Sequence, residues 1–199
     1  MKRIFDLFFA IMGLIICSPL FLILIIIIPF DGNGGAFFIQ KRVGKGNVDF
    51  DLYKFRTMKK DADKAGKLTK SDSDPRITSI GAVLRKLKLD ELPQFINIVK
   101  GDMSFVGPRP EVRRYVDTYD EEQKKVLTVK PGITDPASLA YIKENEILGK
   151  ANDPEKEYIE NIMPQKLKMN LEYIENRGFG RDMKIIATTI GKVLKAFYS

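Results

Sequence analysis

The segment from residue 7 to residue 30 constrains the fold most, because it reads LFFAIMGLIICSPLFLILIIIIPF and carries no charge. At about 1.5 Å per residue, a straight helix of this length reaches across the hydrocarbon core of a bilayer. It is too long for a cleaved signal peptide, and no convincing cleavage site follows it. Pro19 removes a helical donor, and Ser18 can bond to the freed backbone. The segment therefore predicts a membrane helix with a bend at Ser18 and Pro19.

The flanking charges bear on how this helix enters the membrane. Cations lie on both sides of it, at Lys2, Arg3, Lys41, Arg42 and Lys45. The positive-inside tendency is best satisfied when both ends stay cytoplasmic, as in a helical hairpin that enters one leaflet and returns. The charges favour this re-entrant hairpin, while a kinked single span stays open as the alternative.

The overall composition narrows the partners and the metal chemistry. A net charge of +7 and a pI near 9.3 predict a polyanionic partner, which is a nucleic acid, an anionic membrane surface or a phosphorylated substrate. The chain has no histidine and only one cysteine, Cys17, so an intramolecular disulfide and a Cys/His zinc site are both excluded. Any metal must be held by carboxylates and phosphates, which favours magnesium or manganese.

Residues 36–58 predict two strands joined at the turn-rich tetrapeptide GKGN. In the second strand Lys54 and Arg56 share one parity, so a continuous strand projects both cations to the same side. Two cations aimed together suit a phosphate, and a solvated strand end is the competing interpretation.

The rest of the chain predicts mainly helices. Residues 59–75 are polar and predict a loop, which is either a lid over a site or a solvated connection. Helices are expected near 80–87, from Pro93 to Gly101, at 111–127, at 155–175 and from Asp182 onward. The last of these is amphipathic and basic, so it either lies on a membrane surface or packs on a core. The predicted fold class is α+β, mainly helical with a small β-hairpin.

Two adjacent carboxylates, Asp90 and Glu91, stand out in the stretch LKLDELPQF at 87–95. Neighbours on a helix or strand face different ways, so a chemical pair at this spacing needs a turn or a helix end. The helix predicted from Pro93 supplies one, with unpaired amides and the positive end of its dipole. Taken alone, the stretch favours simple N-capping by Asp90.

The surrounding residues favour chemistry instead. Arg76, Arg85 and Arg109 each offer paired donors to phosphate oxygens. An acidic pair among cations is what a magnesium-diphosphate site requires, because carboxylates hold the ion while the ion and the arginines neutralise a leaving phosphate. A carboxylate is also a competent nucleophile toward phosphorus. We therefore expect Asp90 and Glu91 to act as catalytic residues and magnesium ligands.

Several ordered motifs resemble a known family. They are DPRITSIGAVLRKLKLDELPQFINIVKGDMSFVGPRP at 74–110, QKRVG at 40–44, YKFRTM at 53–58 and KPGIT at 130–134. Together they resemble the bacterial sugar transferases known as small monotopic phosphoglycosyl transferases, and the likeness covers nearly the whole chain. The resemblance implies a re-entrant membrane helix bent at Ser18 and Pro19, forming residues 1–35, amphipathic interfacial helices, and a cytoplasmic catalytic domain at 36–199.

The resemblance also implies a reaction. Members of this family transfer a sugar phosphate from a UDP-sugar to undecaprenyl phosphate and release UMP, through a covalent phosphosugar on an aspartate, with Mg²⁺. By position Asp90 is that nucleophile, and Glu91 assists at the metal or as a proton acceptor. The expected phosphate contacts, in order of decreasing support, are Arg109, Arg85, Arg56 and Lys54. The implied location is the cytoplasmic face of the bacterial inner membrane.

Other partners and roles are less determined. No nucleic-acid motif is present, and a homodimer is left open. The alternative to an enzyme is a non-catalytic, membrane-anchored basic module that binds lipid or nucleic acid. Many relatives have glycine after the PGIT motif where this chain has Asp135, so the donor sugar is undetermined. The sequence assigns no role to Asp102 or Asp182.

Overall fold

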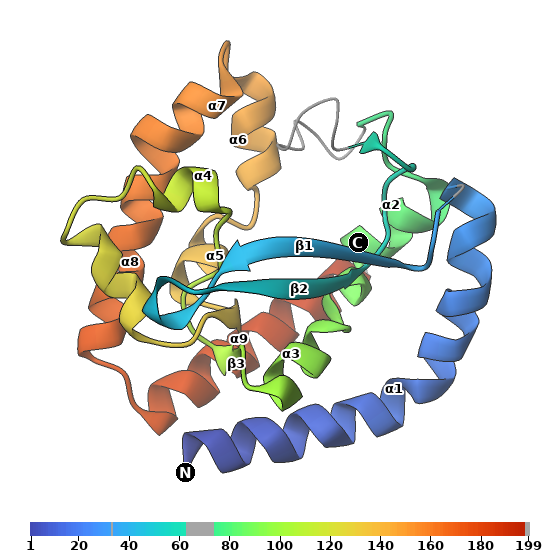
Figure 1. Cartoon of the computed structure of the whole chain (residues 1–199), viewed down its shortest axis with the longest axis horizontal. Helices are drawn as coiled ribbons and strands as arrows, with labels where there is room; N and C mark the ends of the chain where they lie inside the picture. The colour runs from blue at the N-terminus through green and yellow to red at the C-terminus, as the bar shows by residue number, and fades with distance from the viewer. Residues whose placement is uncertain (33, 63–73, 198–199) are drawn as a thin grey trace.

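A computed structural model describes residues 1–32, 34–62 and 74–197. Within these residues the protein is mainly helical and contains two small two-stranded sheets, which confirms the predicted fold class (Figure 1). Most of the loop predicted at 59–75 lies outside the described residues.

Helix α1 (Lys2–Gly32) takes up the whole apolar segment and contains Pro19 and Pro29. Figure 1 shows it as two legs joined at a bend, with the second leg turning up along the edge of the molecule. The hydroxyl of Ser18 donates to the carbonyl of Ile15 at 2.7 Å, which satisfies a backbone group near the proline. α1 is long and apolar enough to cross a membrane by length and composition, and no other described helix is.

One side of α1 packs on the rest of the protein. Ala10 is buried with Ile98, and Phe95 lies directly against Gly13. In the second leg Leu24 and Ile28 are buried in a separate cluster. Much of the remaining surface of the helix is exposed and apolar, at Ile4, Phe8, Ile15, Ile16, Leu22, Ile26 and Phe30. The helix therefore has a protein-facing side and a large apolar side that needs another environment.

The predicted hairpin is confirmed. Strands β1 (Phe37–Val43) and β2 (Asp49–Phe55) pair antiparallel, with Phe38 opposite Lys54. Their connection is the short turn η1 (Lys45–Asn47), in which Gly46 has φ 72°. Glycine adopts this left-handed conformation at little cost, so GKGN makes the turn that its composition predicts.

The middle of the chain folds into short elements beneath the hairpin. They are α2 (Ser79–Lys86), the 3-10 turn η3 (Leu89–Glu91), α3 (Gln94–Lys100) and β3 (Ser104–Val106). Pro93 stands at the N-cap of α3, and Gly101 ends that helix with φ 98°, as expected. Strand β3 pairs in parallel with β4 (Gly132–Thr134), a pairing that no sequence pattern predicts.

The helix predicted at 111–127 is wrong. The structure has α4 (Arg113–Val116) and the 3-10 helix η4 (Gln123–Thr128) with a break between them. The carboxylate of Asp120 accepts from the amide of Gln123, the first residue of η4, at 2.8 Å and fixes the turn before that helix. This local bond competes with a continuous helix.

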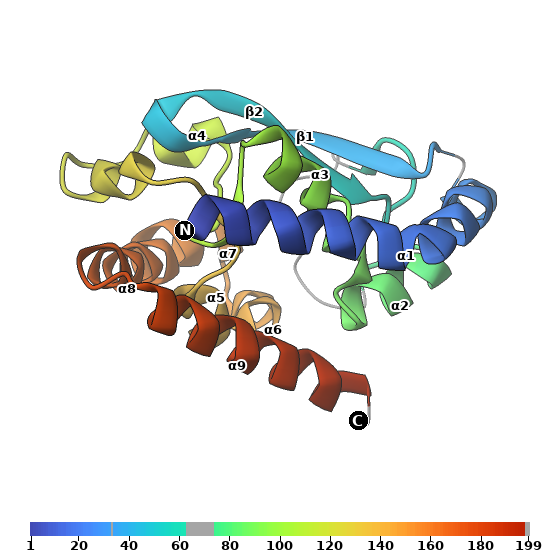
Figure 2. The same cartoon turned by 90° about the horizontal axis from the view of Figure 1, so that it is seen from below.

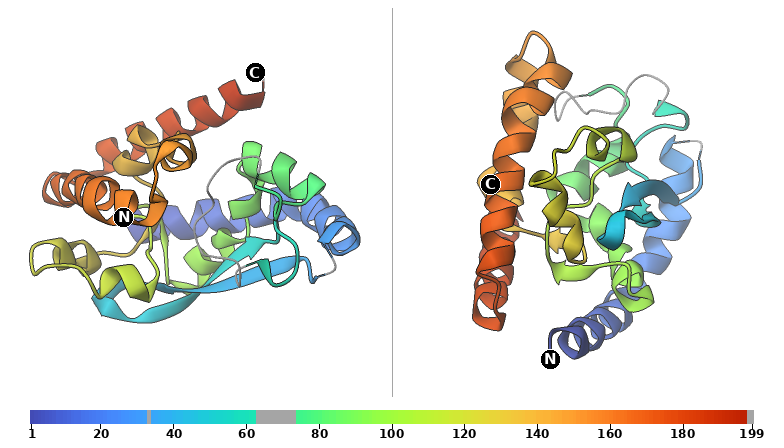
Figure 3. Two further views of the ribbon diagram at one scale, coloured as in Figure 1. Left: turned by 90° about the horizontal axis from the view of Figure 1, so that it is seen from above. Right: turned by 60° about the vertical axis from the view of Figure 1, so that its left-hand side comes forward.

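The C-terminal half is a helical layer. It contains α5 (Pro136–Ala140), α6 (Glu144–Lys150), α7 (Pro154–Glu157), the π-helical turn η5 (Tyr158–Ile162) and α8 (Met163–Glu175). The last three follow one another directly and confirm the helix predicted at 155–175. Their apolar face encloses the largest core cluster, which includes Tyr115, Leu148, Met163 and Leu167. Figure 3 shows α8 at the edge of the molecule.

Helix α9 (Phe179–Phe197) follows α8 and returns toward α1. Ile185 is buried against β3, whereas Phe179, Ile190 and Leu194 are exposed. Figure 2 shows α1 and α9 running across the same face of the molecule, seen from below. The helix predicted from Asp182 is thus confirmed, and it packs on the core while leaving a second apolar side uncovered.

Candidate active site

The two adjacent carboxylates lie in the turn η3, between α2 and α3. Lys88 starts this turn in the left-handed conformation, with φ 56°, which is uncommon for a side chain other than glycine. Asp90 and Glu91 are each 9% exposed. The N-cap of α3 is Pro93, and no side chain caps that helix. The interpretation of Asp90 as a simple N-cap of α3 is therefore wrong.

Glu91 is held by two cations. Its Oε1 accepts from the ammonium of Lys54 at 3.1 Å and from the guanidinium of Arg109 at 2.5 Å. Burial opposes ionisation of this carboxyl, but the charges of Arg109 and Lys54 outweigh burial and hold its pKa well below the usual range. Glu91 is consequently an ionised carboxylate whose charge is compensated, and whose position is fixed, by Lys54 and Arg109.

Asp90 lies in a different environment although it is the next residue. Its Oδ1 is buried and has no hydrogen-bond partner among the described residues. Burial raises the pKa of Asp90, with Lys54 opposing and Glu91 adding to this rise. A buried polar atom without a partner is costly, and such an atom on a carboxyl group with a perturbed pKa is typical of functional sites.

Asn97 on α3 holds strand β2, which carries Lys54, next to the dyad. This fully buried side chain on α3 accepts from the amide of Tyr53 at 3.0 Å and donates to the carbonyl of Asp51 at 2.7 Å. It also donates to Asp102 at 3.2 Å, which gives that carboxylate a structural partner. The hairpin is thereby fixed against α3, and Lys54 reaches the dyad from β2.

The other predicted cations are placed differently. Arg85 lies in the last turn of α2, and its charge opposes in small part the rise that burial causes in the pKa of Asp90. Arg56 is not brought to the dyad, because its guanidinium donates to the carbonyls of Gly35 and Phe37 at 2.7 and 3.1 Å. Arg76 makes a two-pronged pair with Asp74, whose pKa it lowers to about 2. Phosphate contacts by Arg85 and Arg56 stay predictions.

The chain matches the family described as bacterial sugar transferase over residues 1–196. It belongs to the bacterial sugar transferase family. This match covers the long apolar helix α1, the hairpin and the dyad together.

Named relatives of this sugar transferase differ in length. An Aeromonas hydrophila UDP-N-acetylgalactosamine-undecaprenyl-phosphate N-acetylgalactosaminephosphotransferase is 38% identical over 98% of the chain, which spans only 44% of that protein. The Bacillus subtilis uncharacterized sugar transferase EpsL is 38% identical, with 98% of this chain and 87% of EpsL covered. A Caulobacter vibrioides UDP-glucose:undecaprenyl-phosphate glucose-1-phosphate transferase is 31% identical, with 97% and 69% covered.

Behind Arg109 the sugar transferase has a buried polar network that sequence reasoning missed. Arg42 donates to the carbonyl of Pro110 at 2.9 Å, and its guanidinium lies 3.5 Å from the carboxylate of Glu111. Tyr158 donates to the same carboxylate. Burial lowers the pKa of Arg42 and raises that of Tyr158. Arg42 lies in the QKRVG motif and Glu111 directly follows GPRP, so both motifs carried a signal.

Asp135 and Asp182 each form structural bonds. Asp135 is fully buried and caps α5, accepting from the amide of Ser138 at 3.0 Å. Asp182 binds Lys2 and accepts from the hydroxyl of Tyr173 at 2.5 Å, which joins α9 to the start of α1. Lys2 also donates to the carbonyl of Val106 at 3.0 Å.

The dyad is the candidate metal site. Among the described residues no group of three or more acidic, histidine or cysteine side chains could hold a metal ion. Magnesium typically takes only one or two protein carboxylates and completes its shell with phosphates and water. The unpaired Oδ1 of Asp90 beside Glu91 fits such a site.

Proposed function

We propose that this protein transfers a sugar phosphate from a UDP-sugar to undecaprenyl phosphate, releases UMP and thereby starts the assembly of a lipid-linked glycan. The observation that carries the proposal is the unpaired, buried carboxylate of Asp90 beside a Glu91 that Lys54 and Arg109 neutralise. The names of the Aeromonas and Caulobacter relatives give undecaprenyl phosphate as the acceptor. Because the chain spans less than half of the Aeromonas protein, its own activity requires a direct test.

The proposed reaction has two displacements at phosphorus. In the first, an oxygen of Asp90 attacks the sugar-bearing phosphorus of the donor, and the bond to the UMP oxygen breaks. In the second, a phosphate oxygen of the lipid attacks the same phosphorus and displaces Asp90 with its electron pair. Burial and the raised pKa of Asp90 support this role, since a less solvated, more basic carboxylate is the better nucleophile.

The cations around the dyad are suited to the phosphates. Arg109 offers a planar fork of donors, and Lys54 a compact charge, to the oxygens on which charge develops. In the proposed site Asp90 and Glu91 hold Mg²⁺, which supplies further neutralisation of the diphosphate. Glu91 keeps Arg109 and Lys54 in place before the donor arrives, so little reorganisation is needed.

We also propose that α1 enters the cytoplasmic leaflet of the inner membrane and returns. Both ends of the helix bind the same body: Lys2 bonds to Val106 and Asp182, and Asp31 accepts from the amide of Ile80 at 2.6 Å. The ends of a helix that crosses a bilayer are separated by about 30 Å of hydrocarbon. Shared contacts at both ends, with the bend near Pro19, therefore support re-entry.

The apolar surfaces support a membrane location at one face. Helices α1 and α9 run across the same face of the molecule (Figure 2), and both carry large exposed apolar side chains. A lipid acceptor keeps its phosphate at headgroup depth, so a site above this face meets the acceptor without leaving the membrane surface. The division into residues 1–35 and 36–199 and a homodimer both remain predictions.

UMP release tests the proposed reaction. Purified protein in detergent is given Mg²⁺, undecaprenyl phosphate and each of several UDP-sugars, and UMP is measured. Asp90→Asn should abolish release, whereas Asp117→Asn, at an exposed acidic position, should not. UMP release by Asp90→Asn at the wild-type rate would contradict the proposal. Binding of oligonucleotides without any UMP release would favour a non-catalytic basic module instead.

A further inference from the structure

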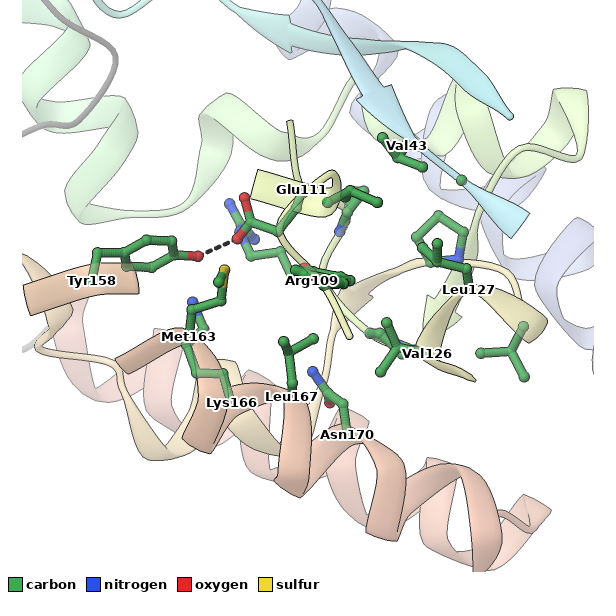
Figure 4. A pocket seen from close by; sticks show the side chains of 17 residues that line it. Val43, Arg109, Glu111, Val126, Leu127, Tyr158, Met163, Lys166, Leu167 and Asn170 are labelled. Carbon is green, nitrogen blue, oxygen red and sulfur yellow. Dashed lines mark hydrogen bonds between the residues drawn. The ribbon is translucent and has the colours of Figure 1, made fainter. Parts of the chain in front are cut away.

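A pocket lined in part by Arg109 lies between the segment 108–111, the 3-10 helix η4 and helix α8 (Figure 4). Its water-accessible volume is ≈ 30 Å³, enough for about two water molecules. The pocket is therefore too small for a uracil ring or an isoprenoid chain, and suits a small substituent.

The lining combines an apolar wall with a few polar groups. The wall consists of Val116, Val126, Leu127, Met163 and Leu167. Three polar side chains of the pocket have partners: Arg109 binds Glu91, Tyr158 donates to Glu111, and Lys166 lies 2.7 Å from Glu144. These three side chains therefore already have partners within the protein and do not require a ligand.

Asn170 differs from these residues. It is 4% exposed, lines the pocket from α8, and its Oδ1 is buried without a hydrogen-bond partner among the described residues. Figure 4 shows Asn170, Leu167 and Met163 projecting from α8 toward the segment that carries Arg109. A buried amide oxygen left unpaired costs free energy, which a ligand with an N–H donor would recover.

Arg109 connects this pocket to the chemistry. One of its nitrogens binds Glu91, while the side chain forms part of the pocket lining. A diphosphate lying against Asp90 and Arg109 thus brings the sugar on that phosphate within reach of the pocket. The nearest small groups on such a donor are the substituents of the sugar ring.

We propose that the pocket receives the acetamido group of a UDP-N-acetylhexosamine and that Asn170 selects for it. This rests on the proposed transferase function. An acetamido group carries one N–H donor, one carbonyl acceptor and one methyl, which match the Asn170 amide and the apolar wall. A sugar with a hydroxyl at that position leaves the amide without its full set of partners, so it is the poorer donor.

Paired donors test this selectivity. UDP-N-acetylgalactosamine is compared with UDP-galactose, and UDP-N-acetylglucosamine with UDP-glucose, by kcat/KM for UMP release. The wild type should prefer the acetamido member of a pair. Asn170→Leu should lower kcat/KM for the acetamido donor by roughly tenfold or more and leave the hydroxyl donor nearly unchanged. Asn161→Leu, an exposed asparagine on the preceding turn, is the matched control.

Other results separate the two proposals. No UMP from the wild type with any donor overturns the transferase function itself. UMP release with equal use of both members of each pair, or an Asn170→Leu ratio equal to that of wild type, overturns the pocket assignment alone. Because Asn170→Leu removes an unpaired polar atom, its thermal unfolding in detergent should match wild type. The same comparison can be made without turnover. Asn170→Ala is added to the Asp90→Asn variant, and the thermal stabilisation by each donor is measured.

Discussion

Arg109 lies 2.5 Å from the Oε1 of Glu91, and this contact gives the two residues of the dyad unequal roles. Glu91 is compensated in charge and held in position, and it in turn holds the cation in the site. Asp90, one residue earlier, retains a buried oxygen without a partner. In the proposed reaction, this asymmetry suits Glu91 to positioning the cations and Asp90 to nucleophilic attack.

Loss of the Arg109 guanidinium should impair the reaction strongly. We expect Arg109→Ala to reduce the rate of UMP release by about 10²- to 10³-fold, the usual effect of removing a preorganised donor to a developing charge. Arg109→Lys keeps the positive charge but loses the paired N–H donors of the guanidinium, so it should keep only part of the wild-type rate. Arg114→Ala, an exposed arginine paired with Glu155, serves as control. A rate for Arg109→Ala equal to that of the control contradicts the assignment.

Asp90→Asn should be inactive and yet more stable than the wild type. Burial raises the pKa of Asp90 above its unfolded value, so its ionised form costs folding free energy at neutral pH. The expected gain is a few degrees in Tm at pH 7, measured by thermal unfolding in detergent. The gain should shrink as the pH falls through the folded pKa, and vanish below the unfolded value of about 3.9. A lower Tm for Asp90→Asn at pH 7 refutes this.

Gly132→Ala should damage the site from a distance. A Cβ on Gly132 would overlap the backbone of Gly107, which precedes the Pro108-Arg109 pair. We expect a loss of about 2–4 kcal/mol, since the parallel pairing of β3 and β4 leaves no room for repacking. Gly180→Ala, where a Cβ meets open space, should be neutral. Equal unfolding curves for the two variants would show that the close approach is unimportant.

The re-entrant topology predicts the sidedness of two positions. In a Cys17→Ser background, a cysteine in an N-terminal tag and one at Lys45 should both react only with reagent on the cytoplasmic side. Pro19→Leu restores a helical donor and should place the tag on the opposite side in part of the population. Pro29→Leu, near the end of α1, should not. A wild-type tag labelled from outside contradicts re-entry.

Local patterns in the sequence predicted the elements that depend on local chemistry. The apolar run gives α1, the GKGN turn gives the hairpin, and Pro93 with Gly101 bounds α3. The dyad was found because its motif is long and ordered. Its first interpretation as a helix cap failed, since the residues form a separate turn ahead of Pro93.

The remaining features depend on contacts between distant segments. β3 and β4 have three residues each, too few for a periodic pattern, and their pairing is fixed by the close approach of Gly107 to Gly132. Tyr158 meets Glu111 across 47 positions, and Asn170 has no motif around it. Strand alternation predicts that Arg56 points to the same side as Lys54, toward a phosphate. Its guanidinium instead donates to the carbonyls of Gly35 and Phe37.

The bond between Lys2 and Asp182 joins residues separated by 180 positions. During synthesis, α1 leaves the ribosome before α9 has been made. Lys2 therefore has no Asp182 to bind until nearly all of the segment between them has been translated. In the proposed membrane location, α1 reaches the bilayer well before this contact fixes its start against the rest of the protein.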